Sequence, residues 1–330
     1  MSNIPQQIPE GAIRFNTDSN KMEVWIGDKW MQVAVSSPNL DGGARGCFGG
    51  GYSPNKDVID FVTISTAGNA TDFGNLTVAR GSFDAAGSRT RGFWFGGENP
   101  AKDEIDFITF SSTGNATDFG NLTVARFGTT AGSNETRAVI AGGNYPKTNT
   151  IDYITMSSAG NANDFGDLIT GLRRSNAGNS PTRVIYYGGS DSPATNADHV
   201  IQFVTTATLG NSQDFGDTFT GGYSRAKGAI CSSTRALFAG NASPQSNNIE
   251  YVTMSTLGNG VKFGELPVSG AACAGRLGCS SVTKGLTAGG STTNTINYVN
   301  ITTFGDAVDF GDLTVARQYG AGCSNGHGGL

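Results

Sequence analysis

One thirteen-residue segment, GNATDFGNLTVAR, occurs twice in this chain, at residues 68–80 and 114–126, and a looser copy, GDAVDFGDLTVAR, lies at residues 305–317. Alignment on the Phe-Gly step finds six copies at intervals of 46 to 50 residues: Phe73, Phe119, Phe165, Phe215, Phe263 and Phe310. This period is typical of a propeller blade and differs from ankyrin and tetratricopeptide repeats. The chain must therefore fold as six similar units.

Each repeat predicts four short strands. A run of small residues, such as AAGS at 85–88, precedes an apolar run that ends in Gly-Gly, such as FWFGG at 93–97. A loop with Pro or Asn leads to an alternating aromatic strand, such as EIDFITF at 104–110. A Gly-Asn pair, expected to be a hairpin turn with positive φ, then leads into the Asp-Phe-Gly strand. We predict an all-β fold: a six-bladed β-propeller of four-stranded blades, with an N-terminal β-hairpin or meander extension.

The ends of the chain suggest how the ring closes. The first repeat begins at its glycine strand, residues 46–50, whereas the chain ends with a small-residue strand in ARQYGAGCSN. Residues 319–324 are therefore predicted to complete the first blade, which hides two strand edges. The expected division is an attachment hairpin at 1–40 and a propeller at 41–330.

The segment before the repeats predicts a small meander. Ile13 and Phe15 alternate in one strand, and two further strands carry Trp25 and Trp30. An element of this size cannot bury two tryptophans alone. These four residues are predicted to contact the propeller, another copy of the chain or a different protein.

The overall composition disfavours several functions. The net charge is −5 and the 22 basic residues are scattered, which argues against binding to nucleic acid or to a membrane surface. No signal peptide and no run of about 18 apolar residues is evident, so we expect a product made in a cytoplasm without membrane insertion. Five cysteines without a CxxC pair predict free thiols.

The sequence offers few candidates for catalysis. A copper oxidase needs histidine ligands, and the two histidines, His199 and His327, lie far apart in the repeat and are expected to be solvated loop residues. One strand column carries a carboxylate or an amide in every repeat and is expected to make hydrogen bonds between blades: Asp60, Asp106, Asp152, Gln202, Glu250 and Asn297. We therefore predict no catalytic residue, cofactor or metal.

Two further columns have structural interpretations and functional alternatives. Arg80, Arg126 and Arg317, with Arg225 close to register, are expected to pack or to bond backbone carbonyls; the alternative is a ring of charge at one mouth. Cys231, Cys279 and Cys323 are aligned with Gly87, Gly132 and Gly178, so the column is expected to select small residues; the alternative is a metal site.

The loops after the glycine strands differ between repeats, whereas the Gly-Asn connections at the opposite face repeat. Such loops on a rigid ring can vary without disturbing the blades, and they suit carbohydrate or protein surfaces. The candidate receptor-face residues are Tyr52, Asn55, Asn99, Tyr145, Lys147, Asp191, His199 and Gln245.

In the order of its strands each repeat resembles a kelch repeat over residues 46–324, with Phe in place of the usual Trp of the last strand. Residues 11–33 resemble a hairpin of fibre and tail-associated proteins of tailed bacteriophages, and the DFGDLTVAR-type blades are similar to propellers of marine cyanobacterial viruses. The resemblance implies a non-enzymatic virion protein: the hairpin would bind other virion proteins and the propeller a host-surface glycan or protein. A homo-oligomer, a capsid or neck decoration protein, a propeller enzyme and a cellular kelch-type scaffold remain alternatives.

Overall fold

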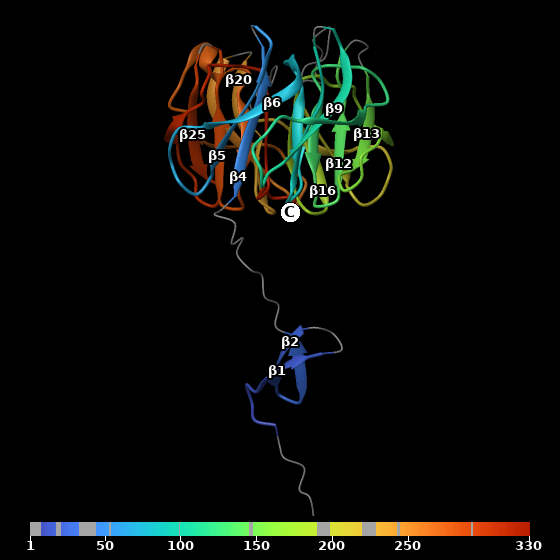
Figure 1. Cartoon of the computed structure of the whole chain (residues 1–330). Helices are drawn as coiled ribbons and strands as arrows, with labels where there is room; N and C mark the ends of the chain where they lie inside the picture. Colours follow the sequence, from blue (N-terminus) through green and yellow to red (C-terminus); the bar gives the residue numbers. More distant parts are fainter. Residues whose placement is uncertain are drawn as a thin grey trace, which may run out of the picture. The chain divides into compact units, whose positions relative to one another are not determined.

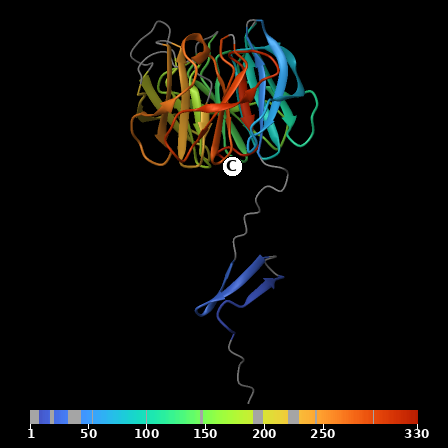
Figure 2. The same cartoon turned by 90° about the vertical axis from the view of Figure 1, so that its left-hand side faces the viewer.

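The computed structural model describes residues 8–17, 21–32, 44–52, 54–98, 100–144, 148–189, 199–219, 229–242, 245–291 and 293–330. The chain divides into two compact units, Met1–Gly42 and Gly43–Leu330 (Figures 1 and 2). Each unit consists mainly of β-strands in its described part, and the larger one also has a turn of 3-10 helix, η2 (Gly270–Cys273).

The smaller unit is a three-stranded antiparallel meander of β1 (Ile13–Asn16), β2 (Lys21–Ile26) and β3 (Lys29–Gln32). A two-residue turn joins β2 to β3, and Gly27 adopts a φ of 66° there. The Glu10 carboxylate accepts the Gly27 N–H at 3.0 Å, which fixes this turn. The predicted meander is therefore present.

The two faces of the meander differ sharply. On one face Trp25 and Trp30 lie opposite each other with their rings 5.4 Å apart. The Arg14 guanidinium lies 4.2 Å from the centre of the Trp30 ring and forms a 2.7 Å ion pair with Glu23. The other face is apolar and exposed over five side chains: Ile13, Phe15, Met22, Ile26 and Met31.

The described part of the larger unit contains six four-stranded antiparallel sheets. The first consists of β27 (Ala321–Ser324), β4 (Arg45–Gly51), β5 (Lys56–Thr63) and β6 (Thr71–Arg80), in that order. The second has β7 (Asp84–Gly87), β8 (Arg91–Gly97), β9 (Lys102–Thr109) and β10 (Thr117–Asn121). The third has β11 (Thr130–Ser133), β12 (Arg137–Ala141), β13 (Thr150–Thr155) and β14 (Asn163–Asp167).

The other three sheets follow the same order. They are β15 (Asn176–Asn179), β16 (Arg183–Tyr187), β17 (Val200–Thr205) and β18 (Gln213–Asp217); β19 (Ala229–Cys231), β20 (Arg235–Ala242), β21 (Gln245–Thr253) and β22 (Val261–Glu265); and β23 (Leu277–Ser280), β24 (Lys284–Ala288), β25 (Thr295–Asn300) and β26 (Val308–Asp312). Each predicted repeat thus supplies one sheet, except that the first borrows its innermost strand from the C-terminal segment. The architecture is β-propeller-like.

The borrowed strand pairs as the sequence predicts. In β27, Ala321 lies opposite Gly49 and Ser324 opposite Gly46 of β4. The innermost strands contact one another in the cyclic order β7, β11, β15, β19, β23, β27 and back to β7. The last sheet therefore meets the first through strands from the two ends of the unit.

The Gly-Asn pair has a different role from the predicted one. Seven residues, 64–70, join β5 to β6, and Asn69 does not have a positive φ, so this pair is not the tip of a two-residue hairpin. Instead it bonds to the neighbouring sheet: Gly114 N–H donates to Phe73 O, and Asn115 Oδ1 accepts the Asn75 N–H at 3.0 Å. The predicted hairpin role was wrong because the hydrogen bonds that require Gly and Asn at these positions are made with the neighbouring repeat.

This contact, which we call the rim latch, recurs at every junction. The acceptor is an Asn or Asp side chain and the donor is the residue after the Phe-Gly step, and the six acceptors are Asn69, Asn115, Asn161, Asn211, Asn259 and Asp306. The Asn69 latch joins the last repeat to the first, because its donor is the Asp312 N–H.

The apolar core lies between adjacent sheets. Trp94 of β8 is fully buried against Cys47, Ile59 and Cys323 of the preceding sheet, and its indole N–H donates to Ala321 O at 3.2 Å. Burial of such a side chain contributes on the order of 2–3 kcal/mol.

In all six sheets the Phe of the Phe-Gly step packs edge-on against an aromatic ring of the preceding, adjacent strand, as in Phe61–Phe73 at 5.8 Å. A Lys or Arg at the start of the second strand of each sheet covers that ring. This stacking explains why the repeats keep Phe-Gly, and it needs no catalytic role for the motif.

Candidate functional site

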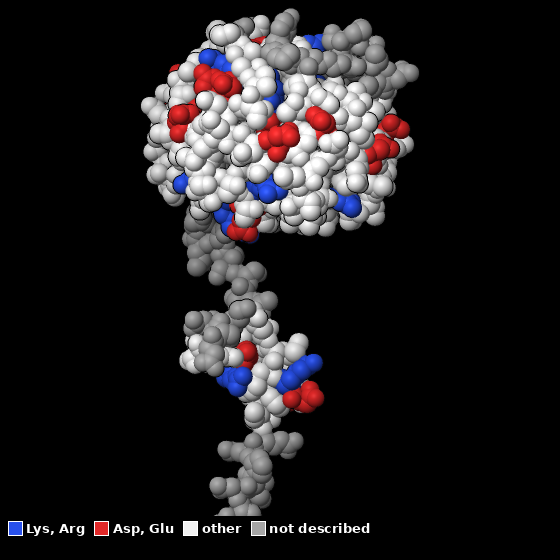
Figure 3. Space-filling view, turned by 90° about the vertical axis from the view of Figure 1, so that its right-hand side faces the viewer, with Lys and Arg blue, Asp and Glu red and all other residues white. Residues whose placement is uncertain are grey.

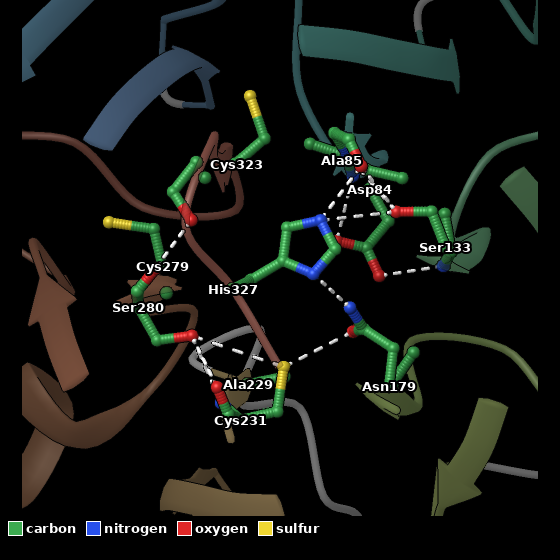
Figure 4. A pocket seen from close by; sticks show the side chains of 17 residues that line it. Asp84, Ala85, Ser133, Asn179, Ala229, Cys231, Cys279, Ser280, Cys323 and His327 are labelled. Atoms are coloured by element: carbon green, nitrogen blue, oxygen red, sulfur yellow. Dashed lines mark hydrogen bonds between the residues drawn. The ribbon is translucent and has the colours of Figure 1, made fainter. Parts of the chain in front are cut away.

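The innermost strands surround a small axial chamber (Figure 4). Its volume is about 40 Å³, enough for about three water molecules but far below the several hundred cubic ångströms of a typical ligand pocket. Small and polar side chains line it, with His327 at its centre. The chamber is therefore a small gap in the packing of the innermost strands and is too small for an organic ligand.

Polar side chains at the ends of the innermost strands satisfy the free strand edges. Ser133 Oγ donates to Gly87 O at 2.7 Å, and Ser280 Oγ donates to Cys231 O at 2.9 Å. Ser324 Oγ in turn donates to Ser280 O at 2.5 Å. Each hydroxyl thus reaches back to the previous innermost strand and replaces the ladder partner that this edge lacks.

The predicted cysteine column is wrong by one residue for Cys231 and for Gly87, which lies opposite Gly92. Cys231 lies opposite Ala236, which places it in register with Ser280 and Ser324 rather than with Cys279 and Cys323. The innermost strands are short and rich in small residues, so the sequence alone does not fix their register.

The other two thiols of the column point into the gap between sheets. A methyl group on Gly46 would lie 2.6 Å from Cys279 Sγ, and one on Gly92 would lie 2.7 Å from Cys323 Sγ. Each thiol therefore fills the space that a glycine of the next sheet leaves open, as expected for a column that selects size.

All five cysteines are free and buried. Burial raises the pKa of Cys231, Cys279 and Cys323, which keeps these thiols protonated and weakly nucleophilic. Among the described residues no group of three His, Cys, Asp or Glu side chains is arranged to hold a metal ion.

His327 is buried, and the expectation of a solvated loop residue was wrong. Its Nδ1 accepts the Gly329 N–H at 3.1 Å and lies 2.6 Å from Asn179 Nδ2, while its Nε2 lies 2.7 Å from Gly87 O. The ring is therefore neutral and protonated on Nε2. Burial lowers the pKa of His327 to about 4.

Glycines explain how the C-terminal segment enters the axis. A methyl group on Gly328 would lie 2.1 Å from the Ser232 backbone, and one on Gly329 would lie 2.0 Å from Ser133 O. Gly328 N–H also donates to Cys231 O at 3.0 Å. No larger residue could approach these strands so closely, so the sequence HGGL forms a plug at this end of the chamber.

The carboxylate column bridges neighbouring repeats, as predicted. Asp152 accepts the Thr123 N–H and hydroxyl of the preceding repeat at 3.1 and 2.7 Å, and it forms a 3.0 Å ion pair with Arg126. Arg80–Asp106 and Arg317–Asp60 repeat this arrangement. These arginines are buried, so they do not form an exposed ring of charge.

Where the Arg–Asp ion pair is absent, both the arginine column and the aspartate column carry different residues. In the fourth sheet Gln202 replaces the aspartate, and buried Leu172 replaces the arginine. Gln202 Oε1 still accepts the backbone N–H of Ile169, the counterpart of Thr123, at 2.8 Å. In the sixth sheet, Asn297 accepts an N–H of Arg276 at 2.7 Å. Arg225 lies outside the described residues.

The strand ends that bound the varied loops, such as the end of β4 and the start of β5, lie opposite the C-terminus in the larger unit (Figure 1). Of the candidate receptor-face residues, Tyr52 and Gln245 are exposed, and Asn55 and His199 are half-buried. Asn99, Tyr145, Lys147 and Asp191 lie outside the described residues. Asn55 Nδ2 reaches Glu98 O at 3.5 Å, so two of these loops contact each other.

Sequence reasoning missed a polar cluster at the mouth of the ring on this same end. Arg174 extends toward the second sheet, where its Nη2 lies 3.3 Å from Ser82 Oγ and 3.7 Å from Glu98 Oε2. Ser82 Oγ donates to Glu98 Oε1 at 2.6 Å. The Arg174 guanidinium also lies 5.2 Å from the centre of the Tyr319 ring. We call Ser82, Glu98, Arg174 and Tyr319 the mouth cluster.

The outer surface carries no concentrated charge in the view of Figure 3, where blue and red residues are interspersed on the larger unit. No helix in the described part of the chain is long and apolar enough to cross a membrane.

Comparison with known proteins adds no relative. No protein-family model and no curated protein sequence matches the chain.

Proposed function

We propose that the chain is a non-enzymatic structural protein of a tailed-bacteriophage particle. Residues 41–330 would form a closed six-bladed kelch-like propeller displayed for host-surface recognition as a tail, fibre or receptor-binding component. Residues 1–40 would anchor it to other virion proteins. The particle would be assembled in the host cytoplasm.

The six rim latches support the closed propeller. Each of the six junctions has the same side-chain acceptor and backbone donor, and at five of them a glycine N–H also donates to the Phe carbonyl. The Asn69 latch makes both bonds between the last repeat and the first. A ring closed in this way leaves its loops as the part that can vary.

The exposed apolar face of the meander is the observation that supports anchoring by residues 1–40. Ile13 and Phe15 are 64% and 59% exposed, and Met22, Ile26 and Met31 extend the same surface. Arg14, Glu23 and the two tryptophans are engaged with one another on the opposite face. An apolar sheet face of this kind marks a protein interaction site, which favours Ile13 and Phe15 as the anchor and gives Trp25 and Trp30 a supporting role.

Substitution within the meander tests the anchor in assembled particles. Ile13→Ser with Phe15→Ser should abolish incorporation of the protein into particles, as should deletion of residues 1–35. Asp28→Asn, in the exposed turn of the same element, is the matched control and should be incorporated normally. Normal incorporation of the double variant would contradict the anchor.

Cryo-electron microscopy of the particle tests the displayed propeller. We expect its density on the tail or fibres. Density on the head or neck would instead favour a decoration protein, and loss of host adsorption by particles lacking the propeller would separate adhesion from decoration.

A further inference from the structure

All three non-glycine residues with positive φ in the described part of the chain occupy one position of the repeat. Ser82, Arg174 and Tyr319 have φ values of 53°, 55° and 54°, and each lies two residues before an innermost strand. Gly128 and Gly275 hold the same position in two other sheets, both with φ of 68°. The ring therefore imposes a left-handed conformation here, whatever the residue.

The backbone explains why the conformation is imposed. Ser82 N–H donates to Tyr319 O at 2.7 Å, Gly128 N–H to Ser82 O at 2.6 Å, and Arg174 N–H to Gly128 O at 2.7 Å. Tyr319 N–H donates to Gly275 O at 2.7 Å. Each repeat thus bonds to the one before it around the mouth. The left-handed conformation directs the backbone N–H and the carbonyl oxygen of this residue toward its two neighbours in the chain of bonds.

Glycine is the residue that meets this demand without strain, and two sheets use it. A serine, an arginine and a tyrosine keep the same backbone at a cost in conformational energy. Residues held in this region against their preference concentrate at ligand-binding sites. The three side chains also differ from one another, so the repeat geometry does not select them.

The side chains converge on one place. Arg174 contacts Ser82 and Glu98 and lies over the Tyr319 ring, although the four residues come from three different sheets or junctions. Tyr52, 38% exposed, packs edge-on against Tyr319 with the rings 6.4 Å apart, and its backbone N–H donates to Gln318 O. The mouth cluster thus continues into the varied loops.

We propose that the mouth cluster with Tyr52 is a binding site for a neutral saccharide residue. This rests on the proposed function, because it names the ligand class of the receptor face. The guanidinium and the carboxylate lie 3.7 Å apart, so an anionic ligand would meet Glu98 and a cationic one would meet Arg174. Adjacent hydroxyl groups can accept from the guanidinium and donate to the carboxylate together.

The two tyrosine rings supply the apolar part of such a site. A saccharide ring presents carbon-bound hydrogens on one side, and the exposed Tyr52 ring beside the half-buried Tyr319 ring offers a matching surface. A few fixed polar groups beside an aromatic wall set orientation and specificity.

Glycine substitution separates a binding role from a structural one. Tyr319→Gly and Arg174→Gly remove the side chains and relieve the backbone, as Gly128 and Gly275 do naturally. The thermal midpoint of the full chain should stay unchanged or rise for both variants. A fall of several degrees would mean that the side chains hold the mouth together, and this would overturn the proposal.

Binding is measured on the same full-length proteins by saturation-transfer difference NMR. The probes are the methyl glycosides of glucose, galactose, mannose and N-acetylglucosamine, with galacturonic acid and inorganic phosphate as anionic probes. The wild-type chain should bind at least one neutral glycoside, and both glycine variants should lose at least tenfold in affinity. Leu209→Ala, at an exposed residue of the β17–β18 connection, is the control and should bind as the wild type does.

The other outcomes would contradict the location of the site, the ligand class or the adhesin function. Equal binding by the variants would place the saccharide site elsewhere and leave the adhesin function standing. Response to the anionic probes alone would overturn the neutral ligand class. Adsorption to host cells without a response to any glycoside would point to a protein receptor, and absence of both would count against the adhesin function itself.

Discussion

At the scale of single residues, buried charges and ring nitrogens in this protein hold neighbouring repeats together. Arg126 and Asp152 are both fully buried and paired, and burial alone would lower the pKa of Arg126 further if Asp152 did not offset it. The fourth sheet shows that the same junction can be made without charge, through Leu172 and Gln202. Removal of one partner is costly because the other charge stays buried.

The natural Leu-Gln junction provides a test. Arg126→Leu alone should lower the free energy of unfolding by about 3–5 kcal/mol, because Asp152 would remain buried without its cation. Adding Asp152→Gln should restore most of that loss, since an amide oxygen can still accept the Thr123 N–H. Urea unfolding of the single and double variants measures the coupling. If the changes in unfolding free energy of the two substitutions simply added, the unpaired buried charge would not be the cause of the destabilisation.

His327 should make stability depend on pH. Its pKa in the folded protein, about 4, lies below the value near 6.5 in an unfolded chain, so the folded state favours the neutral ring. This stabilisation is complete above pH 6.5 and is lost as the pH falls toward 4, by at most about 3 kcal/mol. Unfolding midpoints between pH 4 and 7 should therefore vary less for His327→Gln than for the wild type. An unchanged profile in His327→Gln would contradict this account.

At the scale of the strands, close backbone contacts between repeats set the motif. A methyl group on Gly120 would lie 2.4 Å from Gly160 O, and one on Gly311 would lie 2.3 Å from Gly68 O. The sequence predicted the strand order within each repeat because apolar alternation and glycine positions are local signals. It misassigned the Gly-Asn pair because the partner of that pair lies in the neighbouring repeat.

The seam between the last and first repeats can be probed at the rim latch. Gly311→Ala should lower the free energy of unfolding by about 1–3 kcal/mol, because the new methyl group meets the Gly68 carbonyl. Gly68→Ala has a similarly unfavourable φ, 157° against 150°, but its methyl group would meet open space. The first variant should therefore unfold at clearly lower denaturant concentration than the second, and equal midpoints would show that the contact does not hold the seam.

At the scale of the whole molecule, the sequence predicted more of the ring than of its axis. The repeat period and the missing strand of the first repeat predicted the pairing of residues 319–324 with β4, since a ring leaves one place for an unpaired strand. The axis was not predictable in the same way. His327 and the mouth cluster each join segments far apart in the chain, and no local pattern reports that Arg174 reaches Ser82 and Tyr319. One indication of the mouth cluster was present in the sequence. The position two residues before the small-residue strand is Gly in some repeats and a larger residue in others.

Two C-terminal truncations separate the closing strand from the axial plug. Removal of residues 318–330 deletes β27 and exposes the edge of β4, whose backbone groups then lack their partner. An open edge of this kind can pair with another chain, so this variant should form oligomers that grow with concentration, as measured by light scattering after gel filtration. Removal of residues 326–330 alone deletes His327 and its glycines but keeps every β27 pair, so this shorter protein should stay monomeric if the wild type does and lose only part of its stability. Equal behaviour of the two truncations would mean that the plug closes the ring and that the shared sheet does not.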